Sequence, residues 1–167
     1  KYEVRAAWVT AVYGLDWPRT KATTPTAIRR QQEELTDILD KLKAANFNTI
    51  LFQTRTRGDV LYHSSIEPYN SILTGKVDGD PGYDPLAFAV RECHKRGMEC
   101  HAWMVAIPLG NKKHVASLGN KSVTKQRKEI CIPYKNEYFL NPGHPSTKEY
   151  LMKLVREVVT RYDIDGV

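Results

Sequence analysis

The chain has 167 residues, of which 41% are apolar and 26% are charged, a composition typical of one globular domain with a hydrophobic core. No apolar run reaches the roughly 18–20 residues needed to cross a bilayer, so we expect no membrane-spanning segment. Much of the net charge of +6 comes from the lysine-rich segment 112–128, which carries no nucleic-acid-binding motif. We therefore expect a solvated basic loop there and no nucleic-acid partner.

The sequence indicates no metal site and no cofactor. Cys93, Cys100 and Cys131 lack metal-ligand spacing, and their odd number does not suit a disulfide framework, so we expect buried thiols. The Asp-rich stretch "KVDGDPGYD" lacks the spacing of a calcium loop. The stretch "VYGLDWPRT" lacks the glycines of a phosphate-binding turn, which disfavours nucleotide binding.

Predicted strands and helices alternate from the start of the chain. The stretch "VRAAWVTAVY" (4–13) has the alternation of a strand. A helix is predicted over 24–46, where Thr24 can cap the N-terminus and Pro25 suits the first turn. The second strand is "NTILFQTR" (48–55), so the chain begins with a β-α-β unit.

The next helix is predicted over 84–97. Asp84 can cap its N-terminus, a proline follows at the first helical position, and Gly97 provides the stop signal. The third strand is "ECHAWMVAI", over 99–107. The β-α pattern of the N-terminal part is therefore repeated.

A third helix is predicted over 145–162, where Ser146 and Glu149 form a capping box. The stretch "IDGV" (164–167) then opens a fourth strand. The full pattern is β-α-β-α-β-α-β, which predicts a parallel sheet with right-handed crossovers.

The connections between these elements are asymmetric. The helix-to-strand links are very short, whereas the strand-to-helix links exceed the roughly two to six residues that are usual. The long links therefore lie at the carboxyl ends of the strands, where parallel α/β folds build their active sites. Polar and aromatic residues that alternate along the strands favour a (β/α)₈ barrel over a doubly wound sheet. The long links are 14–23, 56–83 and 108–144.

Polar side chains alternate at the end of the second strand. Gln53, Arg55 and Arg57 point to one side of an extended chain, opposite Ile50 and Phe52. At the mouth of a barrel, these three residues would bind a polar substrate or orient a nearby carboxylate. In the alternative interpretation, one arginine pairs with a buried acid and holds the barrel together.

Two further positions are candidates for substrate contact. His101 and Trp103 share one face of the third strand, where the tryptophan can stack on a sugar ring or simply pack. Asn141 belongs to an Asn-Pro-Gly turn, which either faces the loop side of the sheet or leads into the third helix. Trp8, on the first strand, is expected in the core.

Six stretches of the sequence, taken together and in order, resemble the bacterial glycosyl-hydrolase-like family 10 proteins, and the resemblance covers nearly the whole chain. These stretches are "EVRAAWVT", "GLDWP", "ILDKLKAANFNTILFQTRTRGDVLY", "GYDPLAFAVRECHKRGMECHAW", "LNPGHPSTKEYL" and "YDIDGV". The resemblance implies a (β/α)₈ TIM barrel acting on carbohydrate, with 1–167 as its N-terminal half (four strands and three helices). It also implies an extracytoplasmic location, in the periplasm or at the cell surface.

The resemblance implies that the substrate cleft is lined by Gln53, Arg55, Tyr62, His101, Trp103 and Asn141. Cleavage of an O-glycosidic bond usually takes two carboxylates about 5–10 Å apart. No Asp or Glu stands at the C-terminal end of the first three strands, and Asp165 begins the fourth, where we expect a structural role. The catalytic residues are therefore expected beyond Val167, and the chain alone should be inactive.

Two other functions stay open from the sequence. One is a carbohydrate-binding or scaffold barrel without catalysis, and the other is a barrel hydrolase that cleaves a non-glycosidic bond. Whichever holds, a half barrel leaves strand edges and apolar faces uncovered, so we expect self-association through the exposed sheet edges.

Overall fold

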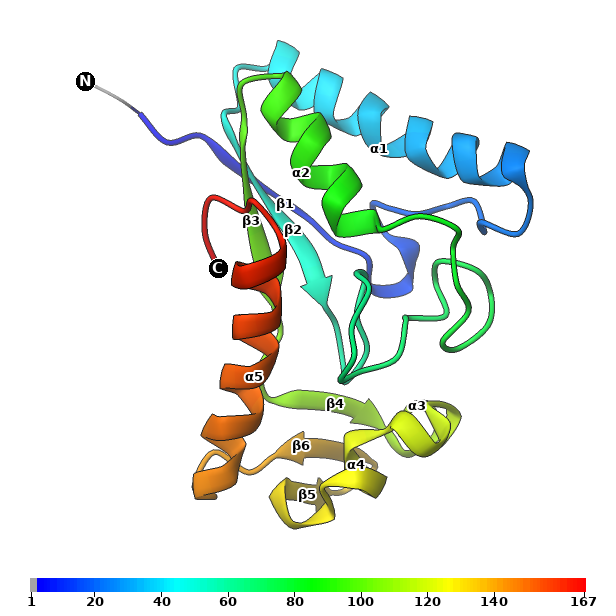
Figure 1. The fold of residues 1–167 in the computed structure, drawn as a ribbon, viewed down its shortest axis with the longest axis vertical. Helices are drawn as coiled ribbons and strands as arrows, with labels where there is room; N and C mark the ends of the chain where they lie inside the picture. The colour runs from blue at the N-terminus through cyan, green and yellow to red at the C-terminus, as the bar shows by residue number, and fades with distance from the viewer. Residues whose placement is uncertain (1–2) are drawn as a thin grey trace.

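The computed structural model describes residues 3–167, which form a mixed α/β fold around a parallel three-stranded sheet of order β1-β2-β3 (Figure 1). β1 covers Ala6–Val9, β2 covers Thr49–Arg55 and β3 covers Glu99–Met104. Both strand pairs are parallel. The parallel sheet predicted from the alternation of strands and helices is therefore confirmed.

Helices α1 (Pro25–Ala44) and α2 (Pro85–Lys95) cover one face of this sheet (Figure 1). Their predicted end signals are confirmed. The Thr24 side chain accepts a hydrogen bond from the backbone N–H of the third residue after it, and Asp84 caps α2 in the same way. Gly97 follows α2 with a φ of 61°, a left-handed conformation that glycine adopts without strain.

The main hydrophobic core lies between the sheet and these two helices. Ile50 and Phe52 project into it from β2, on the side that the alternation predicts. Trp17 is fully buried against Phe52, with ring centroids 5.6 Å apart, and its indole N–H donates to the Gln31 carbonyl at 2.8 Å. The segment after β1 is thereby fastened to α1.

The cysteines are free thiols. Cys93 and Cys100 are buried in the main core, as predicted, whereas Cys131 is only partly buried. Burial raises the pKa of the Cys131 thiol to about 11. No helix in the described part of the chain is long and apolar enough to span a membrane.

The segment between β3 and the last helix is more than the solvated loop expected from its lysines. It folds into a second, antiparallel sheet of order β4-β6-β5 with its own small core. These strands are only four residues long and one contains Pro133, so the sequence lacks the sustained alternation that signals a strand. The elements are β4 (Pro108–Asn111), α3 (Lys112–Ser117), η2 (Gly119–Lys121), α4 (Val123–Gln126), η3 (Lys128–Ile130), β5 (Cys131–Tyr134) and β6 (Glu137–Leu140).

One predicted helix cap and one predicted strand boundary are wrong. Helix α5 covers Pro145–Arg161, and its N-cap is His144, whose ring nitrogen accepts from Ser146 N at 3.2 Å, so Ser146 does not begin a capping box. The reason is Pro145, which takes the first helical position and moves the cap one residue before itself. The first strand stops at Val9, and a 3₁₀ turn, η1 (Val12–Gly14), follows it.

The predicted fourth strand is present only as a single parallel bridge between Gly166 and His101. Asp165 holds this segment at the base of the sheet, because its Oδ2 accepts from Cys100 N at 2.7 Å and lies 2.8 Å from His94 Nε2. Burial acts to raise the pKa of Asp165, but these hydrogen bonds outweigh it and lower the pKa. The contacts of Asp165 are structural, as the sequence suggests.

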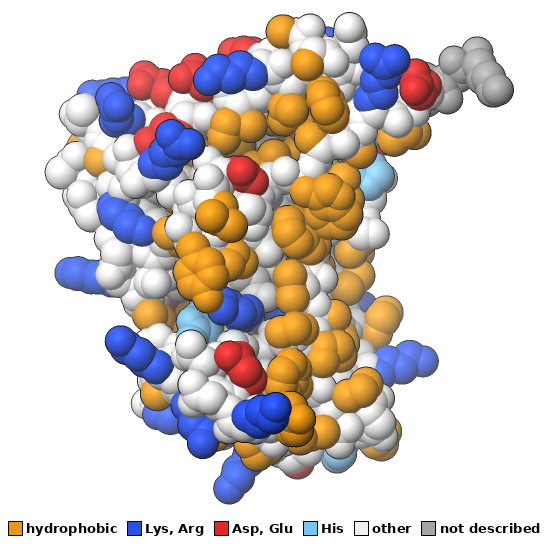
Figure 2. Space-filling model, turned by 180° about the vertical axis from the view of Figure 1, so that it is seen from behind, with side chains coloured by type: hydrophobic (Ala, Val, Ile, Leu, Met, Phe, Trp, Pro, Cys, Tyr) orange, Lys and Arg blue, Asp and Glu red, His pale blue; other side chains and the backbone are white. Residues whose placement is uncertain are grey.

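The face of the sheet opposite α1 and α2 is open, and we call it the open sheet face (Trp8, Leu51, His101 and Trp103). Trp8 is not a core residue, since it is 60% exposed and packs edge-on against Trp103 with ring centroids 4.6 Å apart. Strand alternation sends Val9 to the helix side and Trp8 to the opposite side, which α1 and α2 do not cover. The view from behind shows a long band of hydrophobic side chains on this side of the molecule (Figure 2).

Candidate functional site

The carboxyl ends of β1, β2 and β3 point toward the part of the molecule that holds the long connections (Figure 1). Segments that follow all three strands meet around one polar pocket of about 200 Å³, which we call the loop pocket. Its lining comes from the segment after β1, from the β2–α2 connection and from α3. The lining residues are Val12, Tyr13, Lys21, Thr56, Arg57, Asn70, Ser71, Ile72 and His114.

Gln53 builds one wall of this region indirectly. Its side-chain Oε1 accepts from Thr10 Oγ1 at 2.8 Å, from Ala11 N at 2.7 Å and from Val12 N at 3.0 Å. Three donors from the turn after β1 therefore meet one oxygen at the end of β2. Gln53 is 2% exposed, so its observed role is to position the turn that carries Tyr13.

Arg57 lies in the loop pocket itself. Its Nη1 donates to Tyr13 Oη at 3.0 Å, and its guanidinium carbon lies 4.9 Å from the centroid of the Tyr13 ring. Tyr13 is 75% exposed and has a φ of 58°, an uncommon conformation for a residue other than glycine. The pair forms an exposed aromatic and cationic rim on the pocket.

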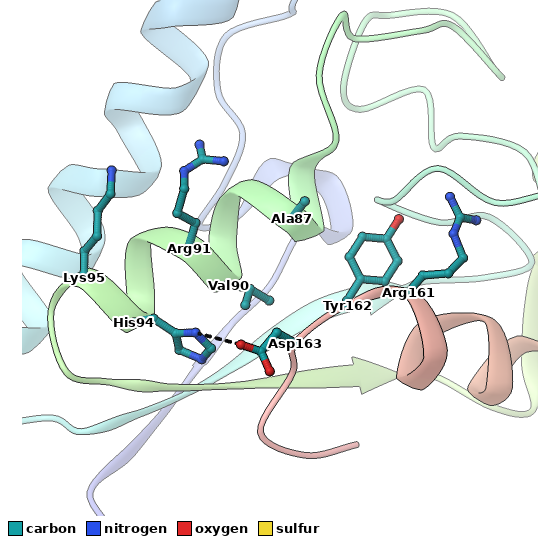
Figure 3. Close-up of a pocket in the computed structure, with 8 residues that line it drawn as sticks. All are labelled: Ala87, Val90, Arg91, His94, Lys95, Arg161, Tyr162 and Asp163. Atoms are coloured by element: carbon teal, nitrogen blue, oxygen red, sulfur yellow. Dashed lines mark ion pairs between the residues drawn. The ribbon is translucent and has the colours of Figure 1, made fainter.

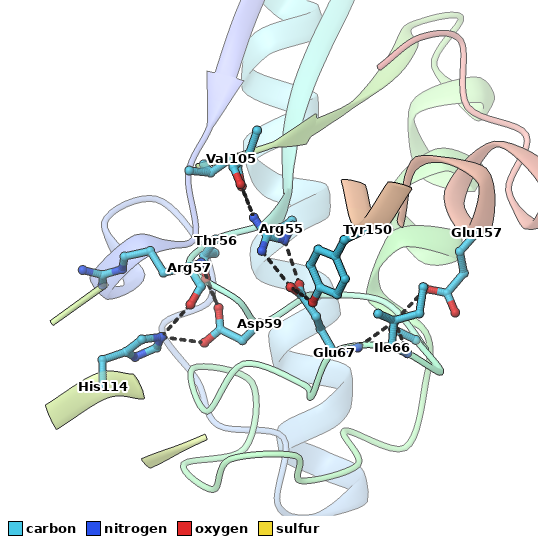
Figure 4. A network of polar contacts seen from close by, with 12 residues as sticks. Arg55, Thr56, Arg57, Asp59, Ile66, Glu67, Val105, His114, Tyr150 and Glu157 are labelled. Atoms are coloured by element: carbon cyan, nitrogen blue, oxygen red, sulfur yellow. Dashed lines mark hydrogen bonds and ion pairs between the residues drawn. The ribbon is translucent and has the colours of Figure 1, made fainter. Parts of the chain in front are cut away.

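His114 closes the pocket from the α3 side (Figure 4). Its Nε2 lies 3.0 Å from the Arg57 carbonyl oxygen and 3.5 Å from Asp59 Oδ2. Asp59 is 1% exposed and also accepts from Thr56 Oγ1 and from Arg57 N. A Cβ added at Gly110, whose φ is 89°, would meet the His114 ring at 2.8 Å, so the close approach of β4 requires glycine.

Arg55 is not in the pocket but forms the buried ion pair of the alternative interpretation (Figure 4). Its Nε and Nη2 donate to the two Glu67 carboxylate oxygens, both at 2.7 Å, and Tyr150 Oη donates to Glu67 at 2.6 Å. Nη1 reaches the carbonyls of Val105 and Ala106, beyond β3. Burial acts to lower the pKa of Arg55, but Glu67 outweighs it and raises the pKa.

This cluster joins three parts of the chain around one buried charge pair. The end of β2 supplies Arg55, the β2–α2 connection supplies Glu67, and α5 supplies Tyr150, whose pKa is raised by burial and by the Glu67 charge. The cluster therefore ties the β2–α2 connection to the end of β2 and to α5.

The other predicted site residues lie apart from the loop pocket. His101 and Trp103 are on the open sheet face, and His101 Nε2 lies 3.1 Å from Glu99 Oε2. Tyr62 is fully buried against Tyr162, and burial raises its pKa. Asn141 is committed to the turn before α5, where its Oδ1 accepts from Gly143 N at 3.0 Å.

The sequence did not reveal two carboxylates near the end of β2. Asp59 and Glu67 follow this strand and return to it through the β2–α2 connection, although neither stands at its C-terminal end. Asp59 is 1% exposed and Glu67 is 2% exposed, and both are engaged by the partners described above. Lys21 and Asn70 were also missed, because they come from loops that carry no motif. The sequence pointed to a buried acid only through Arg55, whose charge on a buried strand needs a carboxylate partner.

A larger hollow lies elsewhere, between α2 and α5 (Figure 3). This groove of about 440 Å³ runs along α2 from Ala87 to Lys95 and is bordered by Arg161, Tyr162 and Asp163 at the end of α5. None of its lining residues comes from the long connections that follow the strands. We favour the smaller loop pocket, because segments after all three strands converge there.

A parallel sheet, helices on one face and a polar pocket at the carboxyl ends of the strands define an α/β protein. A sequence model of the family described as "Glycosyl hydrolase-like 10" matches residues 3–167, and the chain belongs to this family.

The curated relatives are glycosyl hydrolases by name. Glycosyl hydrolase DigH of Escherichia coli K12 is 34% identical over 177 residues, which cover 98% of this chain and 40% of the relative. Glycosyl hydrolase YngK of Bacillus subtilis 168 is 33% identical over 166 residues, which cover 99% of this chain and 32% of the relative. The chain thus spans well under half the length of these relatives.

The solved structures that are similar in fold include an amylase. It is the noncanonic maltogenic alpha-amylase AmyB from Thermotoga neapolitana, with a TM-score of 0.59 and 15% sequence identity. The match covers 98% of this chain and 37% of the amylase chain. At this identity, the likeness shows the fold alone.

Proposed function

We propose that the chain forms the N-terminal half of a (β/α)₈ barrel that cleaves O-glycosidic bonds in oligo- or polysaccharides. The observation that carries this proposal is the convergence of segments from β1, β2 and β3 on one polar pocket. Barrel enzymes build their active sites at this end of the sheet. Family membership and the names of the relatives support carbohydrate as the substrate.

Within this proposal, the residues described have binding and positioning roles. Arg57 and Tyr13 would contact sugar directly from the loop pocket, while Gln53 and Arg55 hold the loops in place. Trp103 would stack on a sugar ring from the open sheet face, which would face the lumen of the complete barrel, and His101 lies on the same face. Asp59 and Glu67 are buried in other contacts, so the acid/base carboxylate pair would come from later strands. Tyr62 and Asn141 would act through packing and turn geometry, because Tyr62 is buried and Asn141 holds the turn before α5.

The alternative is a barrel that binds carbohydrate without cleaving it. It is favoured by the absence of a solvent-open carboxylate among the described residues that line the loop pocket. For both functions we propose the extracytoplasmic location implied by the family resemblance.

An assay with two proteins tests the proposal. The 167-residue chain and a version extended through the rest of its reading frame are incubated with a panel of oligosaccharides, and reducing ends are measured. We expect turnover by the extended protein and binding without turnover by the shorter chain. Turnover by the shorter chain would refute our assignment of catalysis to later strands. Binding without turnover by both would favour the non-catalytic barrel.

We also propose that the isolated chain self-associates through the open sheet face and the free edge of β1. Trp8 is 60% exposed there, and uncovered strand edges and apolar faces promote association. Light scattering should show a mass above 19.1 kDa that rises with concentration, and Trp8→Glu should reduce it. Tyr134→Glu, at an exposed aromatic residue of β5, is the control and should leave the mass unchanged. A monomer at every concentration would contradict the proposal.

A further inference from the structure

The loop pocket gathers positive charge without a carboxylate. Its lining holds two cationic side chains, Lys21 and Arg57, and none of the lining residues, all within 3–167, is an Asp or a Glu. A concave site lined by one sign of charge attracts the opposite sign. The other polar lining residues are neutral: Tyr13, Thr56, Asn70 and Ser71.

One side of the Arg57 guanidinium has no acceptor. Nη1 donates to Tyr13, but Nε is buried and has no hydrogen-bond partner. A buried N–H without a partner is costly, and arginine binds oxyanions best through two neighbouring N–H groups. An anion in the loop pocket would accept from the outer N–H groups of Arg57, and its negative charge would stabilise the guanidinium beside the unpaired Nε.

Lys21 can act on the same anion. Its Nζ donates to the Ile72 carbonyl at 2.8 Å, which leaves two of the three ammonium donors available. Burial lowers the pKa of Lys21, and a bound anion would stabilise its charged form. Asp59 does not supply this negative charge within the pocket, since it is 1% exposed and accepts hydrogen bonds from Thr56 Oγ1 and Arg57 N.

We propose that the loop pocket binds an anionic substituent of a saccharide, a carboxylate or a sulfate group, through Arg57 and Lys21. This inference rests on the proposed function, because the sugar rings would lie in the adjoining cleft. The pocket volume of about 200 Å³ suits one charged group and part of a ring. Longer saccharides would extend from it past the exposed Tyr13.

The Nε–Hε resonance of Arg57 in a ¹H–¹⁵N NMR spectrum tests this directly. The 167-residue chain, below the onset of self-association, is titrated with glucuronate, glucose 6-sulfate and glucose. We expect glucuronate, glucose 6-sulfate or both to shift this resonance, while glucose leaves it in place. A shift by only one of the two anions identifies the preferred group. The inference is overturned when neither anion moves the resonance, or when glucose moves it equally.

Three variants that each remove one positive charge separate binding in the pocket from the effect of net charge. Arg57→Gln and Lys21→Gln should weaken binding of the effective anion roughly tenfold or more, as loss of a charge-assisted hydrogen bond predicts. Lys125→Gln removes an exposed charge outside the pocket and should leave the affinity unchanged. Equal weakening in all three variants would mean that net charge alone attracts the anion, which overturns the inference. The backbone amide of Ser71 reports binding in each variant.

The two proposals fail separately. Neutral oligosaccharides that bind equally well in the wild type and in Arg57→Gln, without any preference for acidic ones, overturn the anion site and leave the sugar cleft standing. Anions that shift Arg57 in a chain that binds no oligosaccharide support the anion site and contradict the proposed function.

Discussion

Glu67→Gln is expected to lower the free energy of unfolding by about 3–5 kcal/mol, because it leaves the Arg55 charge buried without its counter-ion. Both side chains are inaccessible to solvent, and the carboxylate accepts from two arginine nitrogens and from Tyr150. Urea unfolding followed by circular dichroism measures the change. We expect this variant to lose more stability than the other variants described below, because water cannot reach Arg55 to replace the missing carboxylate.

Two other variants separate the charge from the shape of this cluster. Tyr150→Phe removes one hydrogen bond and should cost about 1 kcal/mol. The double variant Arg55→Met with Glu67→Leu should recover much of the loss, because no unpaired charge stays buried. A cost under about 1 kcal/mol for Glu67→Gln would show that the pair does not hold the loops.

Gln53→Leu is expected to cost about 2–4 kcal/mol, because the amide groups of Ala11 and Val12 lose their shared acceptor. The residue is almost fully buried, so these N–H groups cannot all turn to water. The turn that carries Tyr13 should loosen as a result. Urea unfolding gives the stability, and hydrogen exchange of the two amides gives the local effect.

Gln53→Glu is the matched control for this position. A carboxylate oxygen can accept the same three hydrogen bonds, so the variant should keep both amides protected from exchange, although the new buried charge itself costs stability. Loss of protection of both amides in Gln53→Glu, as in Gln53→Leu, would show that side-chain packing, rather than the shared acceptor, explains the role of Gln53.

The local features of the fold could be predicted from the sequence. Helix α2 illustrates this, since Asp84, the following proline and Gly97 are signals that act within a few residues of the helix ends. The capping box at Ser146 failed because a competing local signal, Pro145, was closer to the true start of α5. The β4-β6-β5 sheet was missed because its pairing is non-local and its strands are short.

The candidate site was predictable only in part, for the same reason. Alternation along β2 placed Gln53 and Arg55 on one side of the strand, but it could not name their partners. Glu67 reaches Arg55 through the course of the β2–α2 connection, and Lys21 and His114 meet Arg57 from two other loops. Such contacts depend on how long loops fold over the sheet, which leaves no short-range pattern in the sequence.

Hydrogen–deuterium exchange of the chain with and without oligosaccharides tests most directly where ligand binds. Protection is expected in the segments that surround the loop pocket, 10–22, 56–72 and 110–118, when a saccharide is bound. Protection confined to the groove between α2 and α5, or spread evenly over the molecule, would contradict a binding site at the carboxyl ends of the strands.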